Sequence, residues 1–324
     1  MFASMLLAGI CNLLAASAPT WTWLLVARLA EGAVLGGVPA VAMAWLAEEV
    51  HARDLGKAMG LYVAGTAFGG MMGRVAMGLL LDVSTWRMAM ATMGIAGIAA
   101  AVGFLCLLPR SQNVGARPGL GLAMHRRLWA RHLRHPGLRR LFAISFMLTG
   151  IAIGFMLTGI FVTLFNYAGF RLSGEPFDLG PTAISLMFLS YVSGMVVSTW
   201  TGQITGRLGR RMPLVAAIAL MGMGVLVTWS SALPLIVLGI LLVTLGFFAA
   251  HAIASAWVGH LAKEGQGHAS SLYLLFYYAG SSIVGSSGGW FWQHLGWSGV
   301  IWLTLAVTLA GVLTSLGMTE DADD

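Results

Sequence analysis

Residues 234–261 read PLIVLGILLVTLGFFAAHAIASAWVGHL, a run without a single Asp, Glu, Lys or Arg. A helix needs about 20 apolar residues to cross about 30 Å of hydrocarbon, so this run is long enough to span a bilayer. The rest of the chain is similar: 58% of the 324 residues are hydrophobic, 9% are charged, and the mean hydropathy is +0.84. A soluble domain carries about 25% charged residues. The sequence therefore predicts a polytopic membrane protein.

Apolar runs separated by short polar stretches give ten predicted spans. None of the runs alternates apolar and polar residues as a membrane β-strand does, so we expect an all-α protein. No Lys or Arg precedes the first run, so a cleaved signal peptide is not expected. The two cysteines, Cys11 and Cys106, lie inside apolar runs and indicate no disulfide framework. The predicted spans are 2–18, 20–47, 57–82, 87–108, 139–165, 180–203, 213–232, 234–261, 269–292 and 299–318.

The basic residues lie mainly in alternate loops between these spans. Fourteen of the 18 Lys and Arg residues occupy one set of loops, whereas Arg87 and Arg171 occupy the other. Cytoplasmic loops of membrane proteins carry an excess of Lys and Arg. Both termini and the loop 110–138 are therefore predicted to be cytoplasmic. The net charge of +6 then reflects topology, and no nucleic acid partner is expected.

The stretch 125–140 mixes Arg and His with apolar residues at roughly helical spacing. Two interpretations stay open, a helix lying on the anionic inner leaflet and a solvated basic loop. His125, His132 and His135 have no Cys or carboxylate beside them and several arginines around them, so no metal site is predicted. No cofactor is expected either.

The sequence repeats itself at a nearly constant offset between its two halves. AVAMAW at 40–45 corresponds to AIASAW at 252–257, and YVAG at 62–65 corresponds to YYAG at 277–280. A duplicated membrane protein with parallel halves is one of the transporter architectures. Further pairs in this register are Gly70 with Gly285, Gly73 with Gly288 and Trp86 with Trp297.

In the register of the AVAMAW pair, Met1 corresponds to Pro213, and two spans precede Pro213 in the second half without counterparts in the first. We therefore expect ten transmembrane helices, four of a first six-helix half and a complete second half, with about 75 residues absent from the start. A genuine ten-span protein is the alternative. The predicted domains are 1–109, a truncated N-terminal helical half; 110–138, a cytoplasmic inter-domain loop; 139–319, a C-terminal six-helix half; and 320–324, an acidic cytoplasmic tail.

Residues 202–211, GQITGRLGRR, join two spans on the predicted cytoplasmic side. They resemble the signature Gly-x-x-x-Asp-Arg-x-Gly-Arg-Arg of the major facilitator superfamily, although Gly206 replaces the usual acid. Arg28-x-x-Glu31-Gly32 resembles the fourth-span motif of the same family, Arg-x-x-Gln-Gly, with Glu in place of Gln. The residues that match the cytoplasmic signature are Gly202, Arg207, Gly209, Arg210 and Arg211.

Four glycines of the third predicted span, Gly65, Gly69, Gly70 and Gly73, resemble the antiporter motif of this superfamily. Three of them at i, i+4 and i+8 also make a flat stripe for close helix packing, and the packing and gating interpretations both stay open. The resemblance looks closest to the bacterial drug-efflux and arabinose-efflux-like branch. It implies a major facilitator-type bundle in the bacterial inner membrane, acting as a monomer on a small-molecule substrate and protons.

Arg28, Glu31 and Arg74 lie inside predicted spans. A central charge costs about 2.5–3.5 kcal/mol on insertion scales, so these groups should face the bundle interior and pair, with Glu31 between or near the two arginines. Two nearby cations would keep the Glu31 carboxylate ionised, which favours a structural clamp over a proton carrier. The arginines are then candidate contacts for an anion. His251, a lone histidine in a span, is either a further substrate or coupling candidate or a packing residue.

Three functions remain as hypotheses. Proton-coupled efflux of a small organic solute is the leading one, and it depends on the family resemblance. A facilitator or importer of an anionic or sugar-like solute is the second, and a non-transporting truncated product is the third. An enzyme is not expected, because no Ser–His, paired Asp or His-rich constellation lies at one membrane depth.

Overall fold

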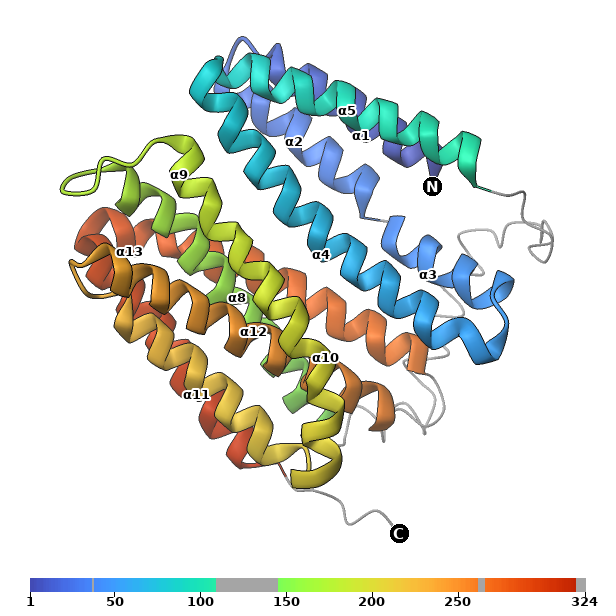
Figure 1. The fold of residues 1–324 in the computed structure, drawn as a ribbon, viewed down its shortest axis with the longest axis vertical. Helices are drawn as coiled ribbons and strands as arrows, with labels where there is room; N and C mark the ends of the chain where they lie inside the picture. Colours follow the sequence, from blue (N-terminus) through green and yellow to red (C-terminus); the bar gives the residue numbers. More distant parts are fainter. Residues whose placement is uncertain (37, 109–144, 262–265, 319–324) are drawn as a thin grey trace. The chain divides into compact units, whose positions relative to one another are not determined.

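The computed structural model describes residues 1–36, 38–108, 145–261 and 266–318, and all regular structure in these ranges is helical (Figure 1). The loop 110–138, with His125, His132 and His135, and the tail 320–324 lie outside the described residues. The chain divides into two compact units. The first comprises Met1–Pro118 with Gly180–Phe188, and the second comprises Gly119–Leu179 with Leu189–Asp324.

The first unit is built around α1, which packs against α2 and α5. Threonine side chains fix where two of these helices begin: the Thr20 hydroxyl accepts a hydrogen bond from the Trp23 amide, and the Thr85 hydroxyl accepts one from the Met88 amide. The helices of this unit are α1 (Phe2–Ala16), α2 (Trp21–Leu35), α3 (Val38–Glu49), α4 (Ala52–Val83), α5 (Trp86–Leu107) and α9 (Pro181–Ser185).

The predicted span 20–47 is wrong as a single helix, because α2 ends at Leu35 and α3 begins at Val38. Pro39 explains the break. It has no amide hydrogen and therefore fits the first turn of a new helix, whereas it would remove a hydrogen bond from a continuous one. Gly36 precedes the break and adds a residue of low helix propensity.

In the second unit, α8 lies along α13, and glycines on both helices allow the close approach. An added Cβ on Gly154 would lie 2.6 Å from the ring of Tyr273, and one on Gly159 would lie 2.8 Å from Val284. The helices of this unit are α8 (Ser145–Ser173), η1 (Leu186–Leu189, shared with the first unit), α10 (Ser190–Leu208), α11 (Arg211–Val227), α12 (Leu233–Leu261) and α13 (Gln266–Leu316).

Two boundaries in the second unit differ from the prediction. The span 139–165 continues in the structure as α8 to Ser173, because polar residues near its end have partners: the Tyr167 hydroxyl donates to the carbonyl of Gly285. Element α13 contains two helices, since Gly296 has φ 60° and ψ −145° in its middle. A positive φ is adopted readily by glycine alone, so Gly296 ends the first helix.

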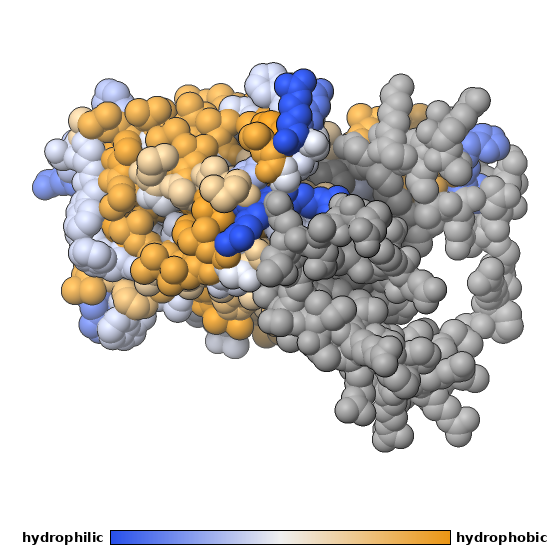
Figure 2. Space-filling model, turned by 90° about the horizontal axis from the view of Figure 1, so that it is seen from below, coloured by the Kyte–Doolittle hydropathy of each residue, from blue (hydrophilic) through white to orange (hydrophobic). Residues whose placement is uncertain are grey.

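Six helices of the described ranges are long and apolar enough to cross a membrane, and α1 and α11 are shorter apolar helices. Ten spans were predicted. The two numbers differ partly because α13 holds two predicted spans and α2 and α3 share one, so the count of ten stays a prediction. Apolar side chains cover much of the described surface in the view of Figure 2, and several, such as Val83 at 83%, are largely exposed. This distribution suits lipid as the surrounding solvent.

Helix boundaries repeat in the register found in the sequence. Trp21, which begins α2, corresponds to Leu233, which begins α12. Trp86 begins α5, and its counterpart Trp297 directly follows the Gly296 break in α13. The helix pair α1–α2 therefore corresponds to α11–α12, which allows each position in one pair to be compared with its equivalent in the other.

Candidate functional site

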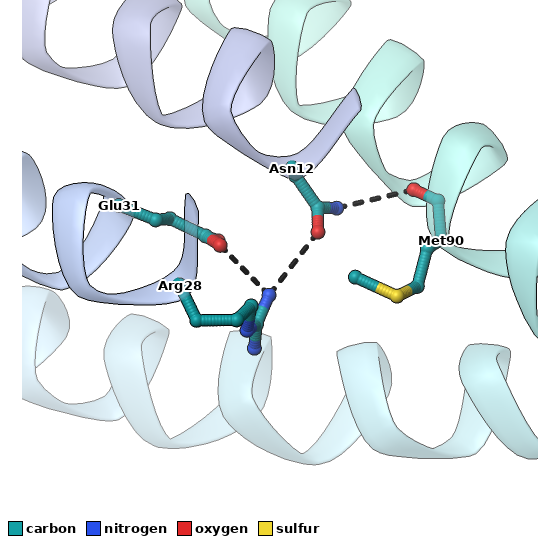
Figure 3. A network of polar contacts seen from close by, with 4 residues as sticks. All are labelled: Asn12, Arg28, Glu31 and Met90. Carbon is teal, nitrogen blue, oxygen red and sulfur yellow. Dashed lines mark hydrogen bonds and ion pairs between the residues drawn. The ribbon is translucent and has the colours of Figure 1, made fainter. Parts of the chain in front are cut away.

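Arg28 lies in a polar network that joins three helices of the first unit (Figure 3). Its NH1 group donates to the Glu31 carboxylate at 2.7 Å and to the side-chain oxygen of Asn12 at 3.1 Å. The amide nitrogen of Asn12 donates in turn to the carbonyl of Met90, on α5, at 3.1 Å. The carboxylate is well covered and the guanidinium less so, with side-chain exposures of 17% for Glu31 and 52% for Arg28.

Arg28 and Glu31 pair because they are three residues apart on α2 and share one side of it. Asn12 comes from α1 and reaches the pair from outside the motif. Asn12 was not among the site residues predicted from the sequence. The signal that could have found it is general: an amide inside an apolar helix must find partners, and a neighbouring ion pair supplies one.

Arg74 does not join this network in the described part of the chain. Its NH1 group donates to the carbonyl of Gly70, one turn earlier on α4, at 3.0 Å. Its guanidinium lies over the ring of Phe188, 5.0 Å from the centroid. The structure thus brings Glu31 to one of the two predicted arginines and holds the other by an aromatic ring.

His251 lies in an aromatic cluster of the second unit. Its Nδ1 atom is 2.8 Å from the hydroxyl of Tyr273, which is 2% exposed. The imidazole is parallel to the ring of Phe247, with centroids 5.8 Å apart, and its centroid is 4.9 Å from that of Tyr277. Tyr273 was missed in the sequence, although it lies four residues before Tyr277 and hence on the same side of α13.

We expect the His251–Tyr273 contact to stabilise the second unit by about 1 kcal/mol, because removing either partner leaves the other's buried polar atom unpaired. His251→Leu and Tyr273→Phe should each lower the free energy of unfolding of the detergent-solubilised chain by about this amount. The double variant should lose less than the sum. Tyr278→Phe is the control, since Tyr278 is 57% exposed. Strictly additive losses would show that the two side chains are not coupled.

The four motif glycines of α4, Gly65, Gly69, Gly70 and Gly73, do not have the close neighbours that a packing stripe requires, within the described ranges. A Cβ added to Gly65 or Gly69 would meet nothing within 4 Å, and one on Gly73 would meet only Met93 at 3.9 Å. A Cβ on Gly70 would meet the Arg74 side chain at 3.5 Å. The equivalent glycines of α13 are in close contact with α8, as Gly288 is with Tyr167.

The segment 202–211 forms the end of α10, a turn and the start of α11. Gly209 takes φ 73° at the turn, a conformation that suits glycine. Arg207 is in the last turn of α10, and Arg210 precedes α11. Arg211 donates a hydrogen bond to the carbonyl of Leu316, which ties the start of α11 to the end of α13. A Cβ added to Gly202, on α10, would meet nothing within 4 Å in the part of the chain that the structure describes.

Comparison with known proteins gives consistent matches. The profile of the Major Facilitator Superfamily matches residues 1–200. The chain is 40% identical over 319 residues to "Uncharacterized MFS-type transporter YybF" of Bacillus subtilis (strain 168), an alignment that covers 96% of the chain and 76% of that relative. It is 42% identical over 303 residues to "Inner membrane transport protein YnfM" of Escherichia coli (strain K12), covering 93% and 70%. A Buchnera aphidicola protein named "Uncharacterized transporter" is 36% identical over 322 residues, covering 99% and 75%. These alignments include residues of both units.

Proposed function

This chain belongs to the major facilitator superfamily and is a membrane transporter rather than an enzyme, and we propose that it exports a small organic solute in exchange for protons. The observation that carries the proposal is the Asn12–Arg28–Glu31 network. Ionisable groups inside membrane helices are costly and usually mark a substrate or ion pathway. In this proposal Arg28 and Glu31 form the central site, with Arg74 and His251 as further substrate or coupling residues.

The proposed direction of transport and the proposed coupling ion depend on a resemblance to the antiporter motif, carried by Gly65, Gly69, Gly70 and Gly73. This resemblance favours the drug-efflux and arabinose-efflux-like branch. The open space beside Gly65 and Gly69 supports a gating role, because α4 could shift there without a clash. The turn at Gly209, with Arg207, Arg210 and Arg211, would hold one conformation of the second unit through the contact with Leu316.

The proposed architecture is ten spans, four within 1–109 and six within 139–319, joined by the loop 110–138. The sequence repeat and the matching helix boundaries support two parallel halves that alternate access to a site between the spans. The distribution of Lys and Arg supports cytoplasmic termini and a cytoplasmic tail at 320–324. A single chain in the inner membrane would be the working unit, with protons and the solute as its small partners.

Import or facilitated passage of an anionic solute is the second candidate, and the exposed guanidinium of Arg28 favours it. The two candidates differ in their dependence on the proton gradient. Export driven by protons needs a group that binds a proton when the solute leaves the site. Among the described carboxylates, Glu31 is our candidate for this group. A facilitator needs none.

Everted membrane vesicles that contain the full chain test the proposal. We expect a panel of radiolabelled organic acids, amines and neutral solutes to include one that accumulates, and a protonophore to abolish its accumulation. Glu31→Gln should lower that uptake roughly tenfold or more, a loss of about 1.4 kcal/mol. Glu175→Gln is the matched control, because Glu175 lies exposed in a loop. Uptake that survives both the protonophore and Glu31→Gln would support a facilitator and overturn proton coupling.

A further inference from the structure

The internal repeat shows that the Asn12–Arg28–Glu31 network is not needed to hold its two helices together. In the register that pairs Trp21 with Leu233, Arg28 corresponds to Ile240 and Glu31 to Val243, which are 2% and 0% exposed. Asn12 corresponds to Gly224, whose added Cβ would lie 2.6 Å from the Val243 amide nitrogen. The equivalent pair α11–α12 thus packs by direct apolar contact. Polar residues at these positions in α1–α2 therefore call for another explanation than packing.

The hydrogen-bond donors of Arg28 that do not contact Asn12 or Glu31 supply such an explanation. A guanidinium has five N–H donors in a planar fork. In the described part of the chain, NH1 alone is engaged, with Asn12 and Glu31 as its acceptors. Figure 3 shows the other two nitrogens pointing away from both partners. The Nε–NH2 edge of Arg28 is therefore held in a fixed orientation and still has its hydrogen-bonding capacity.

Open space lies on the same side of α2 as Arg28. Gly32, four residues after Arg28, is on the same side of α2, and a Cβ added to it would meet nothing within 4 Å among the described residues. Exposed apolar side chains occur around α2: Leu29 at 75% and Val26 at 59% lie about 100° and 160° around the helix from Arg28, whereas Trp21 at 70%, at the start of the helix, lies within about 20° of its direction.

We propose that the Nε–NH2 edge of Arg28 binds a carboxylate of the transported solute in the space beside Gly32, so that the substrate is a small organic acid. Two parallel N–H donors match the two oxygens of a carboxylate, and such bidentate pairs are among the strongest hydrogen-bonded contacts. Glu31 and Asn12 act as positioning residues that hold NH1. This inference rests on the proposed transport function for the identity of the ligand as the solute.

The experiment measures binding to the purified full chain in a neutral detergent, with benzoate as the probe and benzamide as its uncharged isostere. We expect benzoate, and not benzamide, to raise the Tm of the chain. The Kd for benzoate should rise at least tenfold in Arg28→Lys, which keeps the charge and loses the fork, and in Gly32→Leu, which fills the space. Gly103→Leu is the control and should bind within about twofold of the parent chain, because Gly103 lies on α5, outside the proposed site, and a Cβ added there also meets nothing within 4 Å in the described ranges.

Equal binding of benzoate and benzamide, or unchanged binding in Gly32→Leu, would overturn the site even if Arg28→Lys fails to fold. The neutral detergent contains no anionic lipid that could compete for Arg28. If the site binds only an anionic lipid headgroup, benzoate should not change the Tm. Vesicle uptake of a solute without a carboxylate that survives Arg28→Lys would overturn this inference and leave the proposed transport intact. If the purified chain binds benzoate in a way that depends on Arg28, but vesicles transport none of the panel, the site is supported and the transport proposal fails.

Discussion

Replacement of Gly280 by alanine is expected to destabilise the chain by about 3 kcal/mol, the upper end of what overpacking costs, or to prevent folding. Gly280 lies on α13 where that helix crosses α8. An alanine Cβ there would overlap the carbonyl oxygen of Phe155 and lie 2.7 Å from its carbonyl carbon and Cα. The obstacle is backbone, which has no alternative rotamer, so the two helices would have to separate along their contact. The measurement is the Tm and the monodisperse yield of the variant in detergent.

Gly65→Ala is the matched control, because Gly65 is the repeat equivalent of Gly280 at the end of YVAG and YYAG. A Cβ at Gly65 meets nothing within 4 Å in the described ranges, so the change should leave the Tm nearly unaltered. Alanine is favoured over glycine by up to about 1 kcal/mol in a helix, which adds a small gain. A loss at Gly65 as large as that at Gly280 would contradict the open face of α4.

The helices could be predicted from the sequence because hydropathy acts over long windows and needs no knowledge of contacts. The helix boundaries could not be predicted in places where a local backbone effect or a partner distant in the sequence determines them. The break after Leu35 depends on Pro39, and the hydropathy of an apolar run does not indicate the effect of a single proline on helix continuity. The extension of α8 to Ser173 depends on Gly285 and Thr228, whose carbonyls accept from Tyr167 and Arg171 far away in the chain.

The candidate site divides in the same way. The Arg28–Glu31 pair follows from a spacing of three on one helix and is present in the structure. The partner of Arg74 is Phe188, which lies far along the chain on another element, and no local pattern indicates an aromatic ring there. His251 could be marked as a polar residue in an apolar helix, but its hydrogen bond to Tyr273 depends on how α12 and α13 pack.

The two arginines on the minority side of the predicted topology, Arg87 and Arg171, share a structural role. Arg87 donates to the carbonyl of Ala18 at 2.9 Å, and Arg171 donates to that of Ser230 at 2.6 Å. Ala18 and Ser230 are equivalent positions of the repeat, in the α1–α2 and α11–α12 connections. The carbonyls after a helix end have no partner within the helix, and a cation there also complements the helix dipole. A structural requirement thus explains basic residues on the side where the predicted topology disfavours them.

Arg171→Ala is expected to destabilise the chain by about 3 kcal/mol, since it removes two charge-assisted hydrogen bonds worth about 1.5 kcal/mol or more each. Arg171 donates to the carbonyls of Thr228 and Ser230, and its guanidinium lies 5.0 Å from the ring centroid of Trp297. It therefore links the end of α8, the α11–α12 connection and the break in α13. Arg171→Lys should lose less, because an ammonium can replace one of the two bonds but not the planar fork.

Arg87→Ala is the comparison that tests this explanation. Arg87 makes one bond to a carbonyl and is more exposed, so its loss should lower the Tm less than that of Arg171. The indole nitrogen of Trp297 also donates to Thr228, at 3.0 Å, so Trp297→Phe in the Arg171→Ala background should add a further decrease by leaving that carbonyl unpaired. If Arg171→Ala leaves the Tm unchanged while reversing the accessibility of cysteines placed in the 174–180 loop, Arg171 acts on topology and not on this cap.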